Sequence, residues 1–331
     1  MKPGLPRFNY FLGQVQPILT TAGKQKNPAL WLYRNDARTP LFMLEGLAKI
    51  YAELHNKKLF TKVKEHFKLL EDALGGIEFY DSMAKDFVTN KKIPALVITY
   101  LQAQSREKIQ SLNEILAENN WLSYEDNRIV KIQKKLGKAD WKSEEQEAGL
   151  MKDFYGEAVY NIVEFVQGKN FQFTNMESEV HELRRKVRWL SIYPQAVRGA
   201  IQLKETIPRP RHLAKYCLKE ITTSPFNKMA DANGWNYLLF LEKNYFYALS
   251  WMIAELGILK DSGLRIVALQ EALEQTSSAT NENALKEAYR MLGHKQPKML
   301  ELLDTAGDIC KIYFKEQNLE HLVIEISPTK K

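Results

Sequence analysis

The stretch "VHELRRKVRWL", residues 180–190, combines a histidine with closely spaced arginines and a regular row of aliphatic residues. At about 100° per residue of an α-helix, Arg184, Arg185 and Arg188 fall within roughly 60° of His181. The aliphatic residues fall on the opposite side of the same helix, where they would pack into a core. Guanidinium groups one turn apart can grip successive phosphate oxygens through bidentate hydrogen bonds. The spacing therefore indicates a surface for a polyanion.

The positive charge of the chain is concentrated around this stretch. Residues 181–219 contain ten Lys or Arg and two acidic residues, whereas the whole chain has a formal net charge of +7. Solvated helix faces usually mix charges of both signs, because opposite charges three or four residues apart stabilise a helix. An ordinary solvated face nevertheless remains an alternative interpretation, and His181 is as compatible with a structural hydrogen bond as with a ligand contact.

The basic side chains of this segment form the candidate polyanion site. Four of them lie on the stretch described above, and the others follow it along the chain. The candidates are His181, Arg184, Arg185, Arg188, Arg198, Lys204, Arg209, Arg211, Lys215 and Lys219.

Apolar residues recur at spacings of three and four along most of the chain, which is typical of helices. This period predicts an all-α fold, with helices at about 28–55, 57–75, 78–90, 92–119, 144–167, 175–205, 210–221, 232–256, 259–276 and 282–316. Pro194 is expected to kink or divide the basic helix, and Pro208 and Pro210 to end it. The last residues, "HLVIEISPTKK", are expected to form an extended tail or a short edge strand.

The helical pattern stops at "GKNFQFTN", and the two sides of this interruption resemble each other. Each side contains the pattern of an amphipathic helix that ends at Leu-Gly, followed by the start of another helix near an acidic residue. The two matching segments are "KLLEDALGGIEFYDSM" and "SWMIAELGILKDSGL". This faint duplication predicts two matched halves, each a small antiparallel helical bundle. The expected organisation is one domain, 1–331, with a first repeat at 28–167, a linker at 168–175, a second repeat at 176–316 and a tail at 317–331.

Several classes of function lack sequence support. No long apolar run or secretory signal is present, which leads us to expect a cytoplasmic protein without membrane contact. Cys217 and Cys310 are too isolated for a metal or redox motif and are expected to be inert thiols. Phosphate-binding glycine loops and nucleophile motifs are missing, and Asp81 and Asp86 are more typical of structural acids than of metal ligands. We therefore expect neither catalysis nor a cofactor.

The pattern "HELRRKVRWL" followed by "ELGILKD" resembles the second repeat of the conserved-histidine α-helical domain (CHAD) family. That family's signature is a histidine, an arginine three residues later, further basic residues at following turns, and a Leu-Gly corner ending in Asp. The matching positions are His181, Arg184, Arg185, Arg188, Leu256, Gly257, Lys260 and Asp261, whereas Ser191 replaces a basic residue.

The first half resembles the signature less closely. Asn35 stands at the histidine position, Arg38 keeps the arginine, and Phe42 replaces the next basic residue. "LGGIEFYD" keeps Leu-Gly and Asp81 but has Glu78 where a basic residue is usual. The resemblance covers about residues 28–316.

The resemblance implies a pair of helical bundles related by an approximate twofold axis, with basic helices lining a central groove. It further implies a role in binding inorganic polyphosphate. It also implies that Arg38 closes the groove from the first half, in a site dominated by the second half. Members are often joined to a triphosphate-processing domain with an ExExK signature. Because this sequence has no such domain, the resemblance implies binding without hydrolysis.

Two other functions remain open at this stage. Nucleic-acid binding is conceivable because Trp189 and Tyr193 could stack on bases. A helical interaction scaffold with a degenerate anion site is suggested by the eroded first repeat. The oligomeric state is not predicted.

Overall fold

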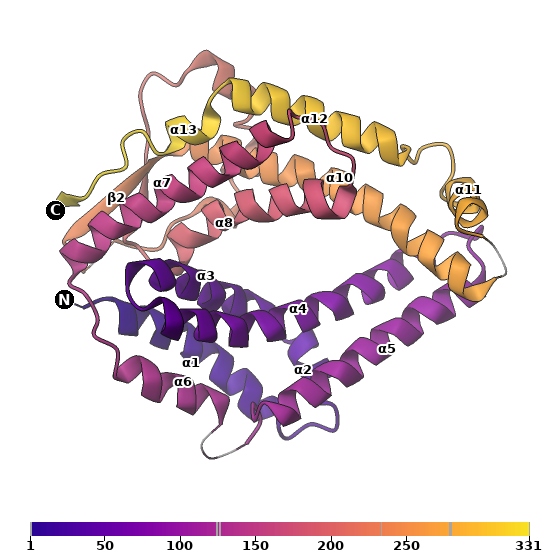
Figure 1. The fold of residues 1–331 in the computed structure, drawn as a ribbon, viewed down its shortest axis with the longest axis horizontal. Coiled ribbons are helices and arrows are strands. Elements are labelled where there is room, and N and C mark those ends of the chain that lie inside the picture. Colours follow the sequence, from indigo (N-terminus) through magenta and orange to yellow (C-terminus); the bar gives the residue numbers. More distant parts are fainter. Residues whose placement is uncertain (1, 124, 126, 233, 278–279, 331) are drawn as a thin grey trace.

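The computed structural model describes residues 2–330 except residues 124, 126, 233, 278 and 279, and it is mostly helical (Figure 1). The expected all-α class is confirmed at this level, with a few short strands in addition. None of the described helices combines the length and apolar character needed to cross a bilayer.

One layer of the molecule comprises the helices of the first half (Figure 1). Along the chain these are α1 (Gly4–Ala22), α2 (Pro28–Arg34), α3 (Arg38–Leu54), α4 (Lys57–Phe87), α5 (Ala95–Glu118) and α6 (Arg128–Gly137). Asparagine side chains begin three of them, because Asn27, Asn56 and Asn127 each accept a hydrogen bond from an amide in the first turn of α2, α4 and α6.

The other layer consists of the second half. Its longer elements are α7 (Glu144–Gly168), the π-helix η1 (Met176–His181), α8 (Glu182–Ala196), α10 (Lys243–Thr276), α11 (Asn281–Leu292) and α12 (Met299–Lys315). Its short elements are β1 (Ile201–Lys204), η2 (Arg211–Lys215), α9 (Lys219–Thr222), η3 (Pro225–Asn227), β2 (Tyr237–Glu242), α13 (Asn318–Leu322) and β3 (Thr329–Lys330).

The strands form a small sheet at the end of the molecule where the C-terminus lies (Figure 1). The strand order is β1-β2-β3, with β1 parallel to β2 and β2 antiparallel to β3. The expected edge strand in the tail is therefore present at Thr329–Lys330. It is preceded by the one-turn helix α13, which the sequence analysis did not predict.

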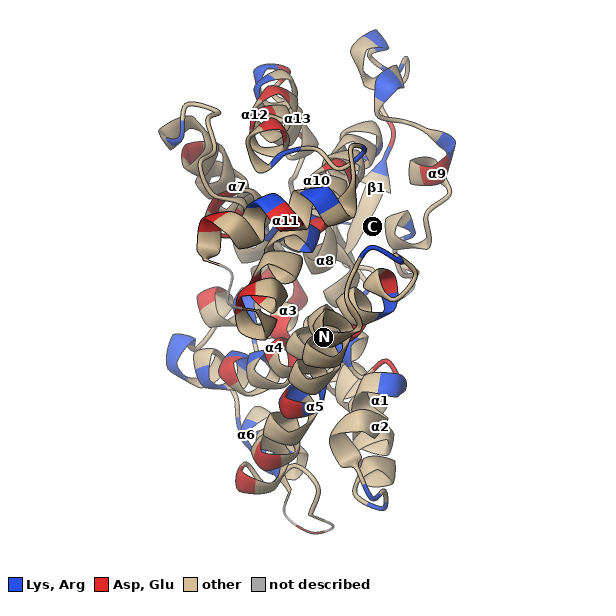
Figure 2. Ribbon diagram, turned by 90° about the vertical axis from the view of Figure 1, so that its right-hand side faces the viewer, with Lys and Arg blue, Asp and Glu red and all other residues tan. Residues whose placement is uncertain are grey.

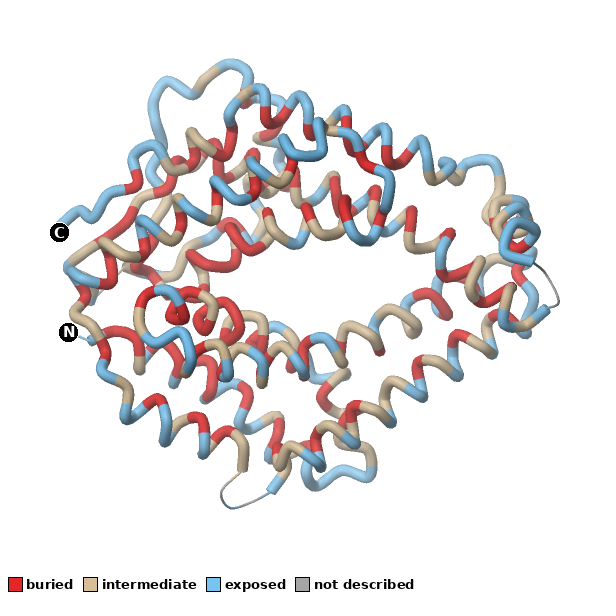
Figure 3. The backbone as a smooth tube through the Cα atoms, viewed as in Figure 1, coloured by how far each residue is buried: buried red, intermediate tan, exposed pale blue. Residues whose placement is uncertain are grey.

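The two layers meet at two apolar cores (Figure 3). In the larger core α3 crosses α8, and Gly46 permits a close approach because a Cβ there would lie 3.3 Å from Ile192 Cγ2. The smaller core closes the other end of the molecule, where Phe87 of α4 and Leu101 of α5 belong to the same buried cluster as Leu269 of α10. The space between the layers is thus bounded at both ends by buried apolar side chains.

Several predicted helix boundaries were wrong, because some predicted helices are joined in the structure and others are divided. The ranges 57–75 and 78–90 form the single helix α4, and 232–256 and 259–276 mostly form α10, so the helices continue through both Leu-Gly positions. The ranges 28–55 and 282–316 are each divided in two, the first around Asp36, whose φ is 49°. Helices α1 and α6 were not predicted.

The basic helix is shorter than predicted. It ends at Ala196, two residues after Pro194, and the chain then turns sharply because Arg198 and Gly199 have φ values of 50° and 87°. β1 follows where the helix was expected to continue to residue 205, and most of 210–221 is a 3₁₀ turn and a one-turn helix.

A glycine substitution tests how the second layer packs. A Cβ at Gly307 of α12 would lie 2.5 Å from the backbone oxygen of Phe171, in the turn that follows α7. Because a backbone atom cannot rotate away, we expect Gly307→Ala to lower the free energy of unfolding by about 1–3 kcal/mol in urea titrations.

The matched control is Gly156→Ala, in the interior of α7, where nothing lies within 4 Å of the added Cβ. That change should stabilise the protein by about 0.5–1 kcal/mol, because alanine loses less backbone entropy in a helix than glycine does. Equal effects of the two substitutions would contradict the packing of α12 on the Phe171 turn.

Candidate functional site

A cavity of about 1490 Å³ lies between the two layers. Its wall is formed by α3 and α4 from the first half, and by η1, α8, α10 and the segment 220–227 from the second half. Four of the sequence-predicted site residues line this cavity, namely Arg38, His181, Arg184 and Arg188.

Arg184 lies in the first turns of α8 and packs against α10. Its Nε donates a hydrogen bond to the backbone oxygen of Ile253 over 3.2 Å. A Cβ at Gly257, one turn further along α10, would lie 3.0 Å from that Nε. Burial lowers the pKa of Arg184, and the charge of Asp261 opposes this shift. The glycine of the Leu-Gly pair therefore makes room for a guanidinium group inside a continuous helix.

Arg38, at the start of α3, is packed in the same manner against α4. A Cβ at Gly75 would lie 2.9 Å from its Nη2. Unlike Arg184, Arg38 is paired with two carboxylates: its Nε donates to Glu71 Oε1 over 2.7 Å, and its Nη1 donates to Glu78. Its charge is therefore largely compensated within the protein.

Arg188 lies one helical turn after Arg184 and faces the same cavity. Its guanidinium carbon is 4.3 Å from the centre of the Phe42 ring. Its guanidinium group has no hydrogen-bond or ion-pair partner among the described residues. Burial, followed by the positive charges of Arg184 and Arg38, lowers the pKa of Arg188. Arg184 and Arg38 therefore both lie close enough to Arg188 to disfavour its positive charge.

His181 is held by a carboxylate on its own helix. Its Nδ1 lies 2.8 Å from Glu177 Oε1, one turn earlier in η1. The hydrogen bond with His181 is the main cause of the lowered pKa of Glu177. The structural role considered for His181 is therefore realised, at the edge of the cavity.

The cavity is not uniformly basic, contrary to the expected basic groove. Within the described chain its lining includes five Lys or Arg side chains and seven Asp or Glu side chains. Lys260 pairs with Asp261 at 2.5 Å, and Arg265 of α10 reaches Asp86 of α4 at 2.9 Å. Free positive charge is thus confined to the wall formed by Arg184 and Arg188.

The remaining predicted site residues lie outside the cavity lining, so the expectation of one long basic trough is not met. Three of them form ion pairs: Arg185 with Glu182 at 2.7 Å on the same helix, Lys204 with Glu325 at 3.3 Å, and Lys215 with Glu316 at 2.5 Å. Arg198 instead stacks on Tyr10, with its guanidinium carbon 3.1 Å from the ring centre. Arg209, Arg211 and Lys219 are exposed on or beside the short elements that follow β1. Because α8 ends at Ala196, the basic residues that follow it lie on separate short elements and not on one helix face. Lys and Arg are spread among Asp and Glu over both layers (Figure 2).

Other residues take on different roles from those considered in the sequence. Trp189 and Tyr193 are buried and stack on each other with ring centres 5.7 Å apart, so they cannot receive bases. Asp81 accepts a hydrogen bond from Tyr33 at 2.7 Å and pairs with Lys85. Glu71 was not predicted as part of the site, although its position one turn before Gly75 on α4 places it on the Arg38 face.

The two cysteines are also placed. Cys310 is buried, and burial raises the pKa of its thiol to about 12, as expected for an inert residue. Cys217 is partly exposed, between η2 and α9.

Comparisons with family models, with curated proteins and with solved structures found no match to this chain.

The orientation of η1 and α8 depends on a carboxylate in η1. Glu179 accepts hydrogen bonds from Lys169 Nζ at 2.6 Å and from the amide of Thr174 at 2.6 Å. Although burial opposes ionisation, these bonds lower the pKa of Glu179 from 4.5 to about 2. The folded protein thus favours ionised Glu179, and this stabilisation is lost as the pH falls from 4.5 toward 2.

We therefore expect Glu179→Gln to destabilise the protein at pH 7, with the difference from wild type shrinking below pH 4.5. Urea titrations at pH 7, 5 and 3 measure this difference. Glu157→Gln, on an exposed position of α7, is the control and should change stability little at any of these pH values. A difference between Glu179→Gln and wild type that does not vary with pH would contradict the role assigned to this carboxylate.

Proposed function

We propose that this protein is a non-catalytic polyanion-binding protein whose ligand is inorganic polyphosphate. The observation that carries the proposal is the pair Arg184 and Arg188. They lie one turn apart on α8 and face a large cavity, and neither makes an ion pair with a carboxylate in the described part of the chain.

Electrostatics favour an anionic occupant at this wall. Arg188 is half-buried beside two other guanidinium groups, which costs free energy unless a negative charge offsets it. An arginine guanidinium group can donate two hydrogen bonds to the oxygens of one phosphate group. A chain of linked phosphates presents such oxygens repeatedly. We propose that Arg184 and Arg188 provide the main contacts, with His181 and Arg38 at the edges of the site.

The proposed architecture is a duplicated helical domain similar to the CHAD family. Its support is the matched pair of contacts in which Arg38 packs on Gly75 and Arg184 packs on Gly257. In both halves the arginine lies in the first turn of an α-helix that packs on a longer helix containing the glycine. We infer that the first half has become a partner that neutralises its own arginine, which leaves the second half to bind the ligand.

A helical interaction scaffold is the second candidate, and a specific observation favours it. Acidic side chains line much of the cavity and would repel a long anionic chain away from the Arg184–Arg188 wall. Nucleic-acid binding has less support, because Trp189 and Tyr193 are buried and offer no stacking surface.

Charge reversal at the two arginines tests the proposal. We expect Arg184→Glu with Arg188→Glu to weaken binding of long-chain polyphosphate by on the order of 100-fold, since two charge-assisted contacts are lost. Wild-type affinity should fall steeply with salt, because bound phosphates release counterions. Titration calorimetry at several salt concentrations measures both effects.

The matched control is Arg209→Glu with Arg211→Glu, which makes the same change of charge outside the cavity lining. That variant should bind within about threefold of wild type, as expected for exposed charges away from a site. Equal losses of polyphosphate affinity in the two double variants would indicate a general effect of net charge. That result would contradict a binding site at Arg184 and Arg188. Weak wild-type binding that neither variant alters would support the scaffold instead, and preference for RNA or DNA of equal charge would support nucleic-acid binding.

A further inference from the structure

A second concentration of positive charge lies on the first half of the molecule. Residues 128–142 contain six Lys or Arg and one acidic residue, Asp140. Helix α6 buries Ile129, Ile132 and Leu136, so its lysines lie on the opposite, solvent-facing side. The sequence analysis missed this cluster because acidic residues elsewhere in the chain cancel it in the overall balance.

These lysines border a hollow and not a flat helix face. A cavity of about 590 Å³ is lined by Lys135 and Lys138 of the α6 region, by Lys142 of the following loop, and by residues at the start of α4. None of the three lysines has an ion-pair partner among the described residues. An ordinary solvated face would not require three unpaired ammonium groups to surround one concavity.

The start of α4 contributes further positive potential to the same cavity. Asn56 and Leu59 are part of its lining, and Asn56 caps the helix by accepting a hydrogen bond from the Leu59 amide at 2.9 Å. The positive end of a helix of 31 residues therefore faces the lysines. Lys57 and Lys58 are exposed in its first turn, and Lys57 lies 3.8 Å from Glu53.

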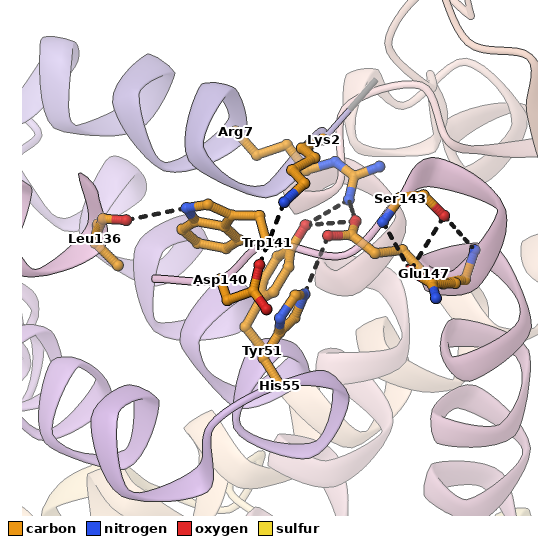
Figure 4. A network of polar contacts seen from close by, with 10 residues as sticks. Lys2, Arg7, Tyr51, His55, Leu136, Asp140, Trp141, Ser143 and Glu147 are labelled. Carbon is orange, nitrogen blue, oxygen red and sulfur yellow. Dashed lines mark hydrogen bonds and ion pairs between the residues drawn. The ribbon is translucent and has the colours of Figure 1, made fainter. Parts of the chain in front are cut away.

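The acids near this cavity are already occupied. Asp140 on its rim pairs with Lys2 at 3.3 Å. Beneath the floor, the buried carboxylate of Glu147 binds Arg7 at 2.7 Å and Tyr51 at 2.9 Å (Figure 4). Both of these carboxylates thus have a cationic partner of their own among the described residues.

His55 connects the floor of the cavity to this buried network. Its side chain is only 5% exposed, and its Nε2 lies 3.2 Å from Glu147 Oε1 (Figure 4). The other ring nitrogen, Nδ1, has no hydrogen-bond partner within the described residues, and His55 lines the cavity. A histidine that is tied to the buried network thus lies among the residues that line the basic hollow.

We propose that this cavity is a second anion-binding site, for a compact ligand carrying phosphate groups, such as a short oligophosphate. Lys135, Lys138 and Lys142 neutralise the ligand as point charges, and the start of α4 orients a phosphate group through its helix dipole. Ammonium groups are compact and strongly hydrated, and they therefore suit a small ligand that keeps part of its hydration. The inference does not depend on the central cavity or on the function proposed for it.

The test is titration calorimetry of the full chain with tripolyphosphate. Lys135→Glu with Lys138→Glu should remove one binding event or weaken it by on the order of 100-fold, since two charged contacts become repulsive. Arg184→Glu with Arg188→Glu should leave that event unchanged, which separates the failure of one site from the failure of the other. Lys138→Gln with Lys142→Gln removes charge without reversing it and should weaken the same event by about tenfold.

The matched control is Lys91→Glu with Lys92→Glu, two exposed lysines at the other end of α4, roughly 45 Å from its start. It makes the same change in net charge and should leave tripolyphosphate binding within about twofold of wild type. The site is overturned if the Lys135/Lys138 variant, folded by circular dichroism, binds as wild type does or loses no more affinity than this control. It is equally overturned if wild type shows no binding event beyond that removed by Arg184→Glu with Arg188→Glu.

Discussion

The separation of the two helical layers is the constraint on which the rest of the structure depends. The layers touch through a large apolar core around α3 and α8 and through a smaller one where α4 and α5 meet α10. Because apolar side chains are buried at both ends, the long helices between them cannot collapse onto each other. A cavity lined by both charged and apolar side chains persists in the middle, and residues distant in sequence face one another across it.

Within that cavity, glycine determines where charge is tolerated. Gly75 and Gly257 interrupt neither α4 nor α10, and each leaves space that an arginine from a neighbouring helix occupies. Half-burying a guanidinium group is unfavourable unless hydrogen bonds or opposite charges compensate it. Arg38 receives that compensation from Glu71 and Glu78, whereas Arg184 receives a single backbone oxygen. Two similar packing arrangements therefore differ in how much positive charge they leave available to a ligand.

The sequence predicted the parts of the structure that are determined locally. Helical periodicity located α5 and α7. The angular spacing of residues around a helix, counted from His181, placed Arg184 and Arg188 on one accessible face. It did not predict the end of the basic helix at Ala196, because that end depends on the left-handed turn at Arg198 and on the pairing of β1 with β2. Nor could it predict pairs such as Lys204 with Glu325, since ion pairs between distant segments depend on the tertiary fold.

The distribution of charge in this protein shows why a local excess of basic residues is a weak indicator of a binding site. Residues 181–219 carry the larger excess, yet acidic partners neutralise several of their side chains, two of them from distant segments of the chain. Within the smaller excess at 128–142, the cavity-lining Lys135, Lys138 and Lys142 have no ion pair among the described residues, while Asp140 pairs with Lys2 and Glu147 is bound by Arg7 and Tyr51. Affinity for an anion depends on the charge left after internal pairing and on a concave surface to hold the ligand. By that measure, the Arg184–Arg188 wall and the lysine-lined cavity are comparable candidate sites, although the sequence indicated only the first.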